Sequence, residues 1–152
     1  MSTFTKLTYH IVFGTKYRRP TITEAISPRL YKYIGGIIRS QHGCLVEIGG
    51  VEDHVHVLAH LSPTNSLSGM VREIKTNSSK WLNGLPEVES RFEWQKGYSA
   101  FTVSQSQVES VARYICNQKE HHRTKTFEEE YIEFLDRHGI EFVKEYMFED
   151  EV

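Results

Sequence analysis

The sequence has little of the material that defines several common classes of protein. Only two cysteines, Cys44 and Cys116, occur among 152 residues, and they form no paired spacing. A disulfide framework and a cysteine-based zinc site are therefore excluded, and we expect a protein of the reducing cytoplasm. No apolar run approaches the roughly 20 residues that cross a bilayer, and no signal-peptide core is present, so we expect no membrane contact. Because no Gly-x-x-x-x-Gly-Lys loop occurs, no nucleotide cofactor is expected.

The length and the ordinary composition, with 39% hydrophobic and 25% charged residues, predict one globular domain. Residues 1–126 are its expected catalytic part, and residues 127–152 form an acidic C-terminal helix and tail of the same domain. The net charge of −2 is unevenly spread, since residues 128–152 carry ten acids and two bases. Residues 1–127 hold sixteen bases and ten acids. A basic body of this kind is compatible with a polyanionic ligand.

Hydrophobic periodicity predicts the order strand, helix, strand, strand, helix, strand, helix. The first six elements match an α+β, split βαβ (ferredoxin- or RRM-like) fold, with a four-stranded antiparallel sheet and two helices on one face. An additional C-terminal helix carries Tyr114, and a short helix is expected at 127–135. The sheet's second face is left for a ligand or the extra helix. The expected strands are 4–14, 44–48, 51–61 and 98–103, with a turn at Gly49-Gly50. The first helix is expected to start at Ser27 and the second at Asn65 or Ser66. A capping box formed by Ser104 and Gln107 is expected to start the third helix.

Two histidines lie one residue apart in the segment Val-Glu-Asp-His54-Val-His56-Val-Leu. On a strand, His54 and His56 emerge on the same face, while Val55 and Val57 point to the other. Neighbouring imidazoles on a rigid strand are a natural start for a divalent metal site. Taken alone, a pair of hydrogen-bonded surface histidines explains the pattern equally well.

A divalent ion needs a third ligand besides these two imidazoles. His60 shares their strand face, but at roughly 3.3 Å per residue it lies about 13 Å beyond His56 and cannot share one ion. The candidate is Gln118, one helical turn after Tyr114. An amide oxygen with two imidazoles is a neutral set that leaves positions open for a phosphate. It suits Mg²⁺ or Mn²⁺ better than structural zinc.

Tyr114 is the candidate nucleophile. A phenol has an ordinary pKa near 10, so it attacks a phosphodiester only when its proton is removed or a metal polarises the phosphate. The covalent phosphotyrosine conserves the energy of the broken bond, so rejoining requires no nucleotide. The alternative is a packing role, because Tyr114 lies at the edge of the apolar stripe of residues 108–115. The predicted histidine strand favours the role of nucleophile for Tyr114 over the packing role.

Five segments support this interpretation by their order and spacing: 9–19, 52–58, 66–81, 94–103 and 111–118. Together they resemble the single-tyrosine HUH transposases of the insertion-sequence-200-like family, over nearly the whole chain. The resemblance implies that Tyr114 is the nucleophile and that His54, His56 and Gln118 bind the metal. It also implies a substrate of single-stranded DNA with hairpins, and a homodimer in which the histidines of one chain often work with the tyrosine of the other.

The expected function is therefore a metal-dependent DNA strand transferase and endonuclease that cleaves and rejoins hairpin-bearing element ends through a 5′-phosphotyrosine intermediate. Three alternatives stay open. The first is a domesticated nuclease that processes repeated palindromes, and the second is a non-enzymatic split βαβ module that binds nucleic acid. The third is a replication or mobilisation nickase, for which 152 residues leave no room for accessory modules.

Two basic groups are candidates for DNA contacts. A loop interleaves bases with an aromatic ring, which suits phosphates and stacked bases. The polar side of the second expected helix carries further bases that could follow a DNA backbone, although a solvated charged face is the commoner role of such residues. The candidates are Lys16, Tyr17, Arg18 and Arg19 in the loop, and Arg72, Lys75 and Lys80 on the helix.

Overall fold

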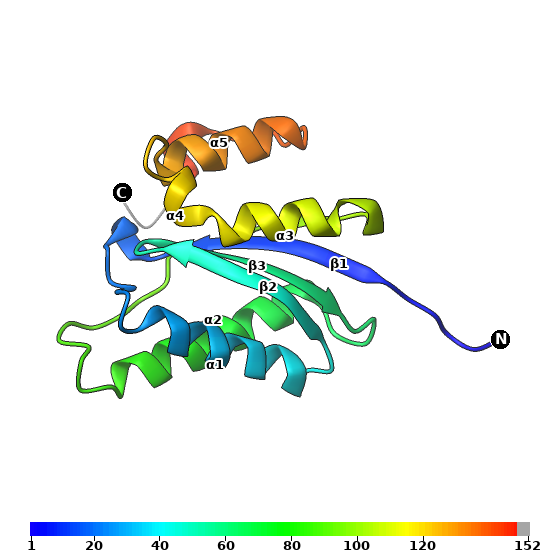
Figure 1. Ribbon diagram of the computed structural model, residues 1–152, viewed down its shortest axis with the longest axis horizontal. Coiled ribbons are helices and arrows are strands. Elements are labelled where there is room, and N and C mark those ends of the chain that lie inside the picture. Colours follow the sequence, from blue (N-terminus) through cyan, green and yellow to red (C-terminus); the bar gives the residue numbers. More distant parts are fainter. Residues whose placement is uncertain (149–152) are drawn as a thin grey trace.

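A four-stranded antiparallel sheet forms the centre of the computed structural model, which describes residues 1–148 (Figure 1). Its strand order is β2-β3-β1-β4, so β1 and β3 are central, and the predicted α+β, split βαβ fold is confirmed. The end of the expected acidic tail, residues 149–152, lies outside the described residues. The strands are β1 (Leu7–Gly14), β2 (Cys44–Val51), β3 (His54–Leu61) and β4 (Ser99–Thr102).

Helices α1 (Ser27–Ser40) and α2 (Leu67–Asn83) cover one face of the sheet (Figure 1). Helix α1 has Pro28 in its first turn, as expected. Helix α2 is capped by Ser66, whose hydroxyl accepts a hydrogen bond from the Gly69 amide at 3.0 Å. The main hydrophobic core lies between these helices and the sheet, and it includes Ile11, Phe13, Leu30, Ile34, Val55, Val57, Met70 and Ile74.

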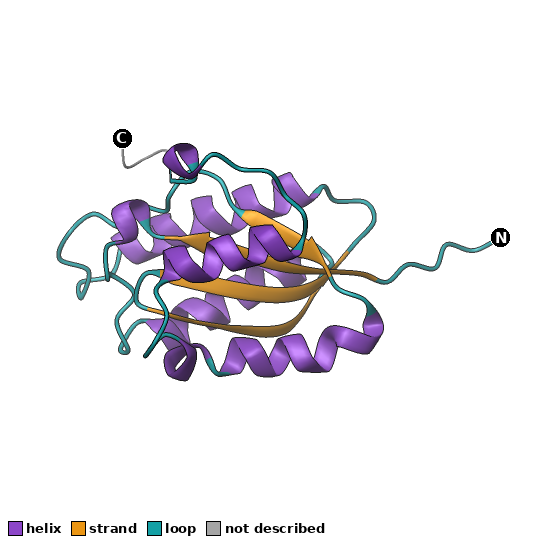
Figure 2. Cartoon of the chain, turned by 90° about the horizontal axis from the view of Figure 1, so that it is seen from above, coloured by secondary structure: helices purple, strands orange, loops and turns teal. Residues whose placement is uncertain are grey.

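The other face of the sheet is covered by the C-terminal helices α3 (Val108–Cys116), α4 (Gln118–His121) and α5 (Phe127–Arg137) (Figure 1). Seen from above, helices lie across the strands while the N-terminal residues extend away from the sheet (Figure 2). Short 3₁₀ turns η1 (Lys16–Arg18) and η2 (Gln105–Gln107) lie between these elements, and a third, η3 (Lys144–Tyr146), follows α5. A second, aromatic core forms under this layer from Val12, Phe101, Phe127, Phe134, Leu135 and Phe148.

The two faces of β3 have different roles, as its alternating pattern predicts. Val55 and Val57 belong to the main core beneath α1 and α2. His54 and His56 therefore point to the opposite face, under α3 and α5. The fold thus places both imidazoles between a rigid central strand and the C-terminal helices. Within residues 1–148, no helix is both long and apolar enough to cross a bilayer.

The expected turn at Gly49-Gly50 is wrong, because both glycines lie inside β2 and the turn follows at residues 52–53. A Cβ atom on Gly49 would lie 2.4 Å from the Ile115 carbonyl oxygen. A Cβ atom on Gly50 would lie 2.2 Å from the His54 carbonyl oxygen. Glycine is needed here for the close approach of other backbone, which brings α3 down onto the sheet.

The region around α3 differs from the prediction in two respects. Within residues 1–148, the Ser104 side chain makes no capping hydrogen bond, and η2 precedes the start of α3. Tyr114 and Gln118 do not share one helix, because α3 ends at Cys116 and Asn117 interrupts the chain before α4. The Asn117 amide donates to the carbonyls of Arg113 and Tyr114, which closes the helix with a tight final turn. The interruption lets Gln118 take its own direction towards β3.

Replacement of Gly49 by alanine tests this close packing. We expect Gly49→Ala to destabilise the protein by about 1–3 kcal/mol, since the added methyl meets backbone that cannot yield easily. The matched control is Gly36→Ala in α1, where the nearest atom to the new Cβ is an Arg39 side-chain nitrogen at 3.8 Å. This control should stabilise by roughly 0.5–1 kcal/mol. Urea unfolding measures both; equal midpoints for the two variants would contradict the packing.

Candidate active site

The two histidines of β3 present their Nε2 atoms to a buried point under the C-terminal helices. Both side chains are 0% exposed. His54 Nδ1 lies 2.7 Å from Asp53 Oδ1, so it donates its proton to that carboxylate. His56 Nδ1 shares a hydrogen bond with His10 Nε2 at 2.8 Å. These partners fix both ring orientations and direct Nε2 into the site, the arrangement common in metal-binding histidines.

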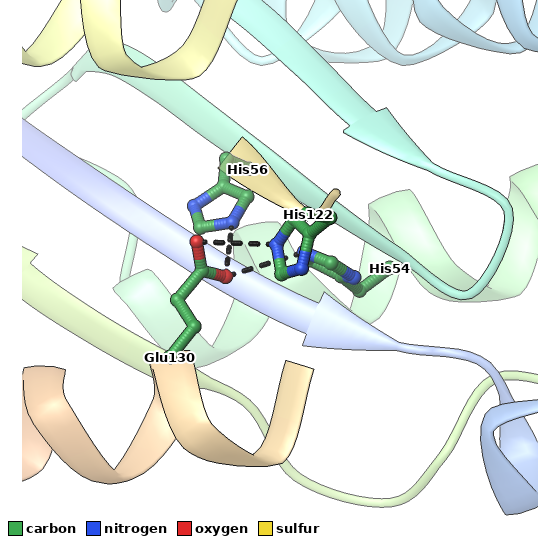
Figure 3. Close-up of side chains that lie close together, drawn as sticks. All are labelled: His54, His56, His122 and Glu130. Carbon is green, nitrogen blue, oxygen red and sulfur yellow. Dashed lines mark hydrogen bonds and ion pairs between the residues drawn. The ribbon is translucent and has the colours of Figure 1, made fainter. Parts of the chain in front are cut away.

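His122 and Glu130 complete a compact group with His54 and His56 (Figure 3). The ligand atoms of these four residues lie within 4.8 Å of one another. The carboxylate of Glu130, which is 1% exposed, is central. Its Oε1 lies 3.0 Å from His56 Nε2 and 3.3 Å from His54 Nε2, and its Oε2 lies 3.2 Å from His122 Nε2. Three imidazoles and one carboxylate of this spacing could hold a divalent metal ion.

The proton pattern of the cluster fits a cation at its centre. His122 Nδ1 lies 2.6 Å from the Lys125 carbonyl oxygen, which can only accept, so Nδ1 is the protonated nitrogen. In the neutral ring Nε2 then carries a lone pair, and this buried atom forms no hydrogen bond within residues 1–148. When the His54 ring is neutral and Nδ1 donates to Asp53, its Nε2 likewise faces the carboxylate with a lone pair. Lone pairs that converge on a carboxylate require a proton or a metal ion between them.

Burial and charge set the protonation of these groups. Burial lowers the pKa of His56 to about 4, against the opposing effect of Glu130, and lowers the pKa of His10 to about 3. Burial also opposes charge on His54, but Asp53 and Glu130 outweigh it and hold the pKa of His54 above its ordinary value. Burial acts to raise the pKa of Glu130, yet its histidine neighbours hold that pKa below the usual range. The carboxylate is therefore ionised beside a neutral His56.

Tyr114 brings its phenol to the edge of this cluster. Its hydroxyl donates to Glu130 Oε2 and lies 3.1 Å from His121 Nε2. Its ring centroid is 5.8 Å from that of His56 in the same chain. Burial and the Glu130 carboxylate both raise the pKa of Tyr114 well above its ordinary value. In this arrangement the phenol keeps its proton.

Gln118 enters the cluster from the start of α4 and is 1% exposed. Its Oε1 lies 3.2 Å from His54 Nε2, and its amide nitrogen lies 3.4 Å from Glu130 Oε2. The structure therefore brings together all four predicted site residues: Tyr114, His54, His56 and Gln118. It also places the Glu130 carboxylate, a negative charge that the sequence does not predict, beside the predicted ligands.

Sequence reasoning misses five members of the site, and two of them leave a signal. His122 stands four residues after Gln118, one helical turn further on. Glu130 interrupts the buried apolar stripe that Phe127 and Phe134 define on α5. An acid on the buried face of an amphipathic helix is rarely without a partner. The residues that the prediction misses are His10, Asp53, His121, His122 and Glu130.

The predicted basic loop forms an unusual turn. Tyr17 and Arg18 both have left-handed backbone angles, with φ of 58° and 52°, which strains residues other than glycine. Tyr17 is 45% exposed, and cations lie near its ring, with Lys16 Nζ at 5.5 Å and the Arg19 guanidinium at 5.0 Å from its centroid. The Arg18 guanidinium lies 4.7 Å from the Phe148 ring centroid. The loop thus presents an exposed aromatic ring among positive charges.

A groove of about 540 Å³ lies beside α2. It is lined by α2, by residues 91–98 and by Lys16. Lys75 is tied to the opposite wall, since its Nζ donates to the carbonyls of Gln95, at 2.8 Å, and Gly97. Of the predicted DNA contacts on α2, Lys80 does not line this groove. The basic residues among its described lining are Lys16, Arg72, Lys75, Arg91 and Lys96, against one acid, Glu93.

Removal of the Asp53 carboxylate tests the metal site. We expect Asp53→Asn to weaken Mn²⁺ binding by about 10–100-fold, because His54 loses the negatively charged acceptor that raises the basicity of its ring. Isothermal titration calorimetry measures the affinity. Asp136→Asn, an exposed change of the same chemistry, is the control. Equal affinity of the two variants for Mn²⁺ would contradict the role given to Asp53.

Comparison with known sequences assigns the chain. The family model described as "Transposase IS200 like" matches residues 3–118. The ISDra2 transposase TnpA of Deinococcus radiodurans is 25% identical over 119 residues, which cover 74% of this chain and 84% of that protein. The transposase for insertion sequence element IS200 of Salmonella typhimurium is 28% identical over 121 residues, covering 74% and 76%. His122, Glu130 and α5 lie beyond the residues that the family model matches.

Solved structures agree in fold. A crystal structure from Deinococcus radiodurans R1, described as a transposase, has a TM-score of 0.59 at 25% identity and covers 78% of this chain and 95% of that one. A REP-associated tyrosine transposase bound to a REP hairpin has a TM-score of 0.61 at 18% identity, covering 80% and 72%. The chain belongs to the IS200-like transposase family, whose members cleave DNA and transfer its strands.

Proposed function

We propose that this protein is a metal-dependent transposase of single-stranded DNA that cleaves and rejoins hairpin-bearing ends through a 5′-phosphotyrosine intermediate. One observation carries the proposal. The hydroxyl of Tyr114 and the imidazoles of His54 and His56 meet at one buried carboxylate, and Gln118 lies at the same point. A nucleophile and a set of metal ligands that converge in this way can act on one phosphate.

Tyr114 is the nucleophile in this proposal. Its phenol oxygen attacks the phosphorus of the scissile phosphodiester, the bond from phosphorus to the 3′-oxygen breaks, and the 5′-phosphate stays on the tyrosine. The phenol proton leaves as the new bond forms, and the released 3′-oxygen takes up a proton. Attack by another 3′-hydroxyl reverses these changes and restores the phenol. The bond energy is retained throughout, so no nucleotide is consumed.

The imidazoles of His54 and His56 and the amide oxygen of Gln118 would hold the cation, with Asp53 orienting His54. A bound divalent ion would neutralise charge on the non-bridging phosphate oxygens and polarise the phosphorus. Imidazole nitrogens suit transition metals better than Mg²⁺, so the residues favour Mn²⁺ of the two expected ions. The homodimer implied by the family resemblance stays a prediction.

The basic groove and the η1 loop are the proposed DNA contacts. The groove residues would neutralise phosphates, and the exposed Tyr17 ring would stack on a base. The solved structure of a REP-associated tyrosine transposase holds a hairpin, which supports a hairpin substrate for this fold. A non-enzymatic module that stacks bases on its sheet is disfavoured, because α3 and α5 cover the sheet face that bears the histidines.

Loss of the phenol oxygen tests the nucleophile. We expect Tyr114→Phe to abolish the covalent protein–DNA adduct formed with hairpin DNA and Mn²⁺, because no other atom of this side chain can attack. Denaturing gels detect the adduct, and Tyr33→Phe, on α1 beneath the opposite face, should form it normally. An adduct that persists in Tyr114→Phe would refute this assignment.

Removal of a groove cation tests the DNA contact. We expect Arg72→Ala to weaken hairpin binding and to reduce the slope of log K against log salt by about 0.7 for each single-strand phosphate that the protein no longer neutralises. Arg39→Ala, which removes the same charge from the exposed end of α1, is the control. Fluorescence anisotropy at several salt concentrations measures both. An equal weakening in both variants would indicate a general charge effect and contradict a specific groove.

A further inference from the structure

Helix α5 occupies the space that a DNA phosphate needs. The Tyr114 hydroxyl donates to Glu130, whose other oxygen lies 3.0 Å from His56 Nε2 and 3.3 Å from His54 Nε2. A scissile phosphate must lie between the nucleophile and the cation that these histidines hold. The Glu130 carboxylate, an anion with two acceptor oxygens, already bridges these groups. Substrate and Glu130 therefore compete for one position.

The aromatic side chains of α5 seal the same site. The Phe127 ring stacks on the His54 ring with a centroid separation of 4.0 Å and an interplanar angle of 5°. A Cβ atom on Gly14 would lie only 2.8 Å from Phe127, so α5 lies directly against β1. The Phe134 ring centroid is 5.1 Å from that of His10 and 5.7 Å from that of Tyr114. These contacts close the site to a phosphodiester while α5 is docked.

Helix α5 is also held by packing and hydrogen-bond contacts that do not involve the site residues. Leu135 is 5% exposed within the aromatic core. The Tyr131 hydroxyl accepts a hydrogen bond from Ser99, and the Tyr131 ring packs on Phe148. A capping box between Thr126 and Glu129 defines where the helix begins. The helix and its cap therefore form one packed unit, which residues 122–126 connect to α4.

The outward side of α5 is unsuited to DNA. Its exposed positions carry three acids, Glu129, Glu133 and Asp136, against one base, Arg137, and Glu128 is half-buried. Acids on this surface repel a polyanion that approaches the site. The helix also lies outside residues 3–118, the part of the chain that matches the family model. The helix that closes the site is thus outside the part of the chain that the family model matches.

We propose that α5 is an autoinhibitory cover, and that Glu130 takes the place of the scissile phosphate until DNA displaces the helix. The proposal rests on the proposed function and adds regulation of the same site. Only molecules with α5 undocked accept substrate, so the rate of adduct formation is reduced by the fraction of molecules that are closed. If Glu130 were instead a permanent ligand of the working metal, its removal would slow the reaction.

Two full-length variants and one control distinguish these cases. Leu135→Ala weakens docking from outside the site, and Glu130→Gln removes the competing charge while keeping the side-chain shape. Both should form the covalent adduct with hairpin DNA and Mn²⁺ faster than the unmodified protein, by about tenfold for Leu135→Ala. Leu82→Ala creates a comparable cavity in the main core, away from α5, and should give no increase.

Hydrogen exchange supplies a readout that is independent of the reaction. With hairpin DNA bound to Tyr114→Phe, amides of α5 should exchange faster, while those of α1 stay unchanged. Slower adduct formation in both α5 variants, a comparable increase in Leu82→Ala, or an α5 that stays protected with DNA bound would overturn the cover. Absence of an adduct in every protein, Leu135→Ala included, would instead overturn the proposed function.

Discussion

The burial of one carboxylate among three imidazoles is the constraint on which the site depends. An ionised Glu130 on the buried face of α5 would be very costly without partners, and His54, His56 and His122 supply them. The same interaction holds the last long helix against the sheet and fixes the place where a cation fits. The contacts of Glu130 that stabilise the docked α5 therefore also block the access of DNA to the site.

The fold follows from local patterns that are legible in the sequence. Alternation in β3 separates Val55 and Val57 from the two histidines, and the Ser66 cap and Pro28 mark helix starts. The turn predicted at Gly49-Gly50 is wrong because the sequence does not show that backbone from other segments approaches these two glycines. Their role is visible once the Ile115 carbonyl is found above Gly49. The glycines are required by contacts with residues distant in the sequence, and not by the turn propensity of glycine.

The site is predictable where one element supplies neighbouring residues and hidden where distant segments meet. His54 and His56 follow from strand geometry, and the family resemblance implies Tyr114 and Gln118. Glu130 lies 74 residues from His56, so no spacing rule could pair them. The break at Asn117 also directs Gln118 and His122 in a way that an uninterrupted helix would not. Packing of the C-terminal helices assembles what the sequence leaves separate.

The central claim is that a single buried point serves both the cation and the attacking phenol. Peptide mapping of the protein–DNA adduct by tandem mass spectrometry tests this most directly. The account predicts that the 5′-phosphorylated nucleotide is attached to the peptide that contains Tyr114, at the phenol oxygen. Attachment to another residue, or loss of the label under conditions that preserve phosphotyrosine, would contradict it.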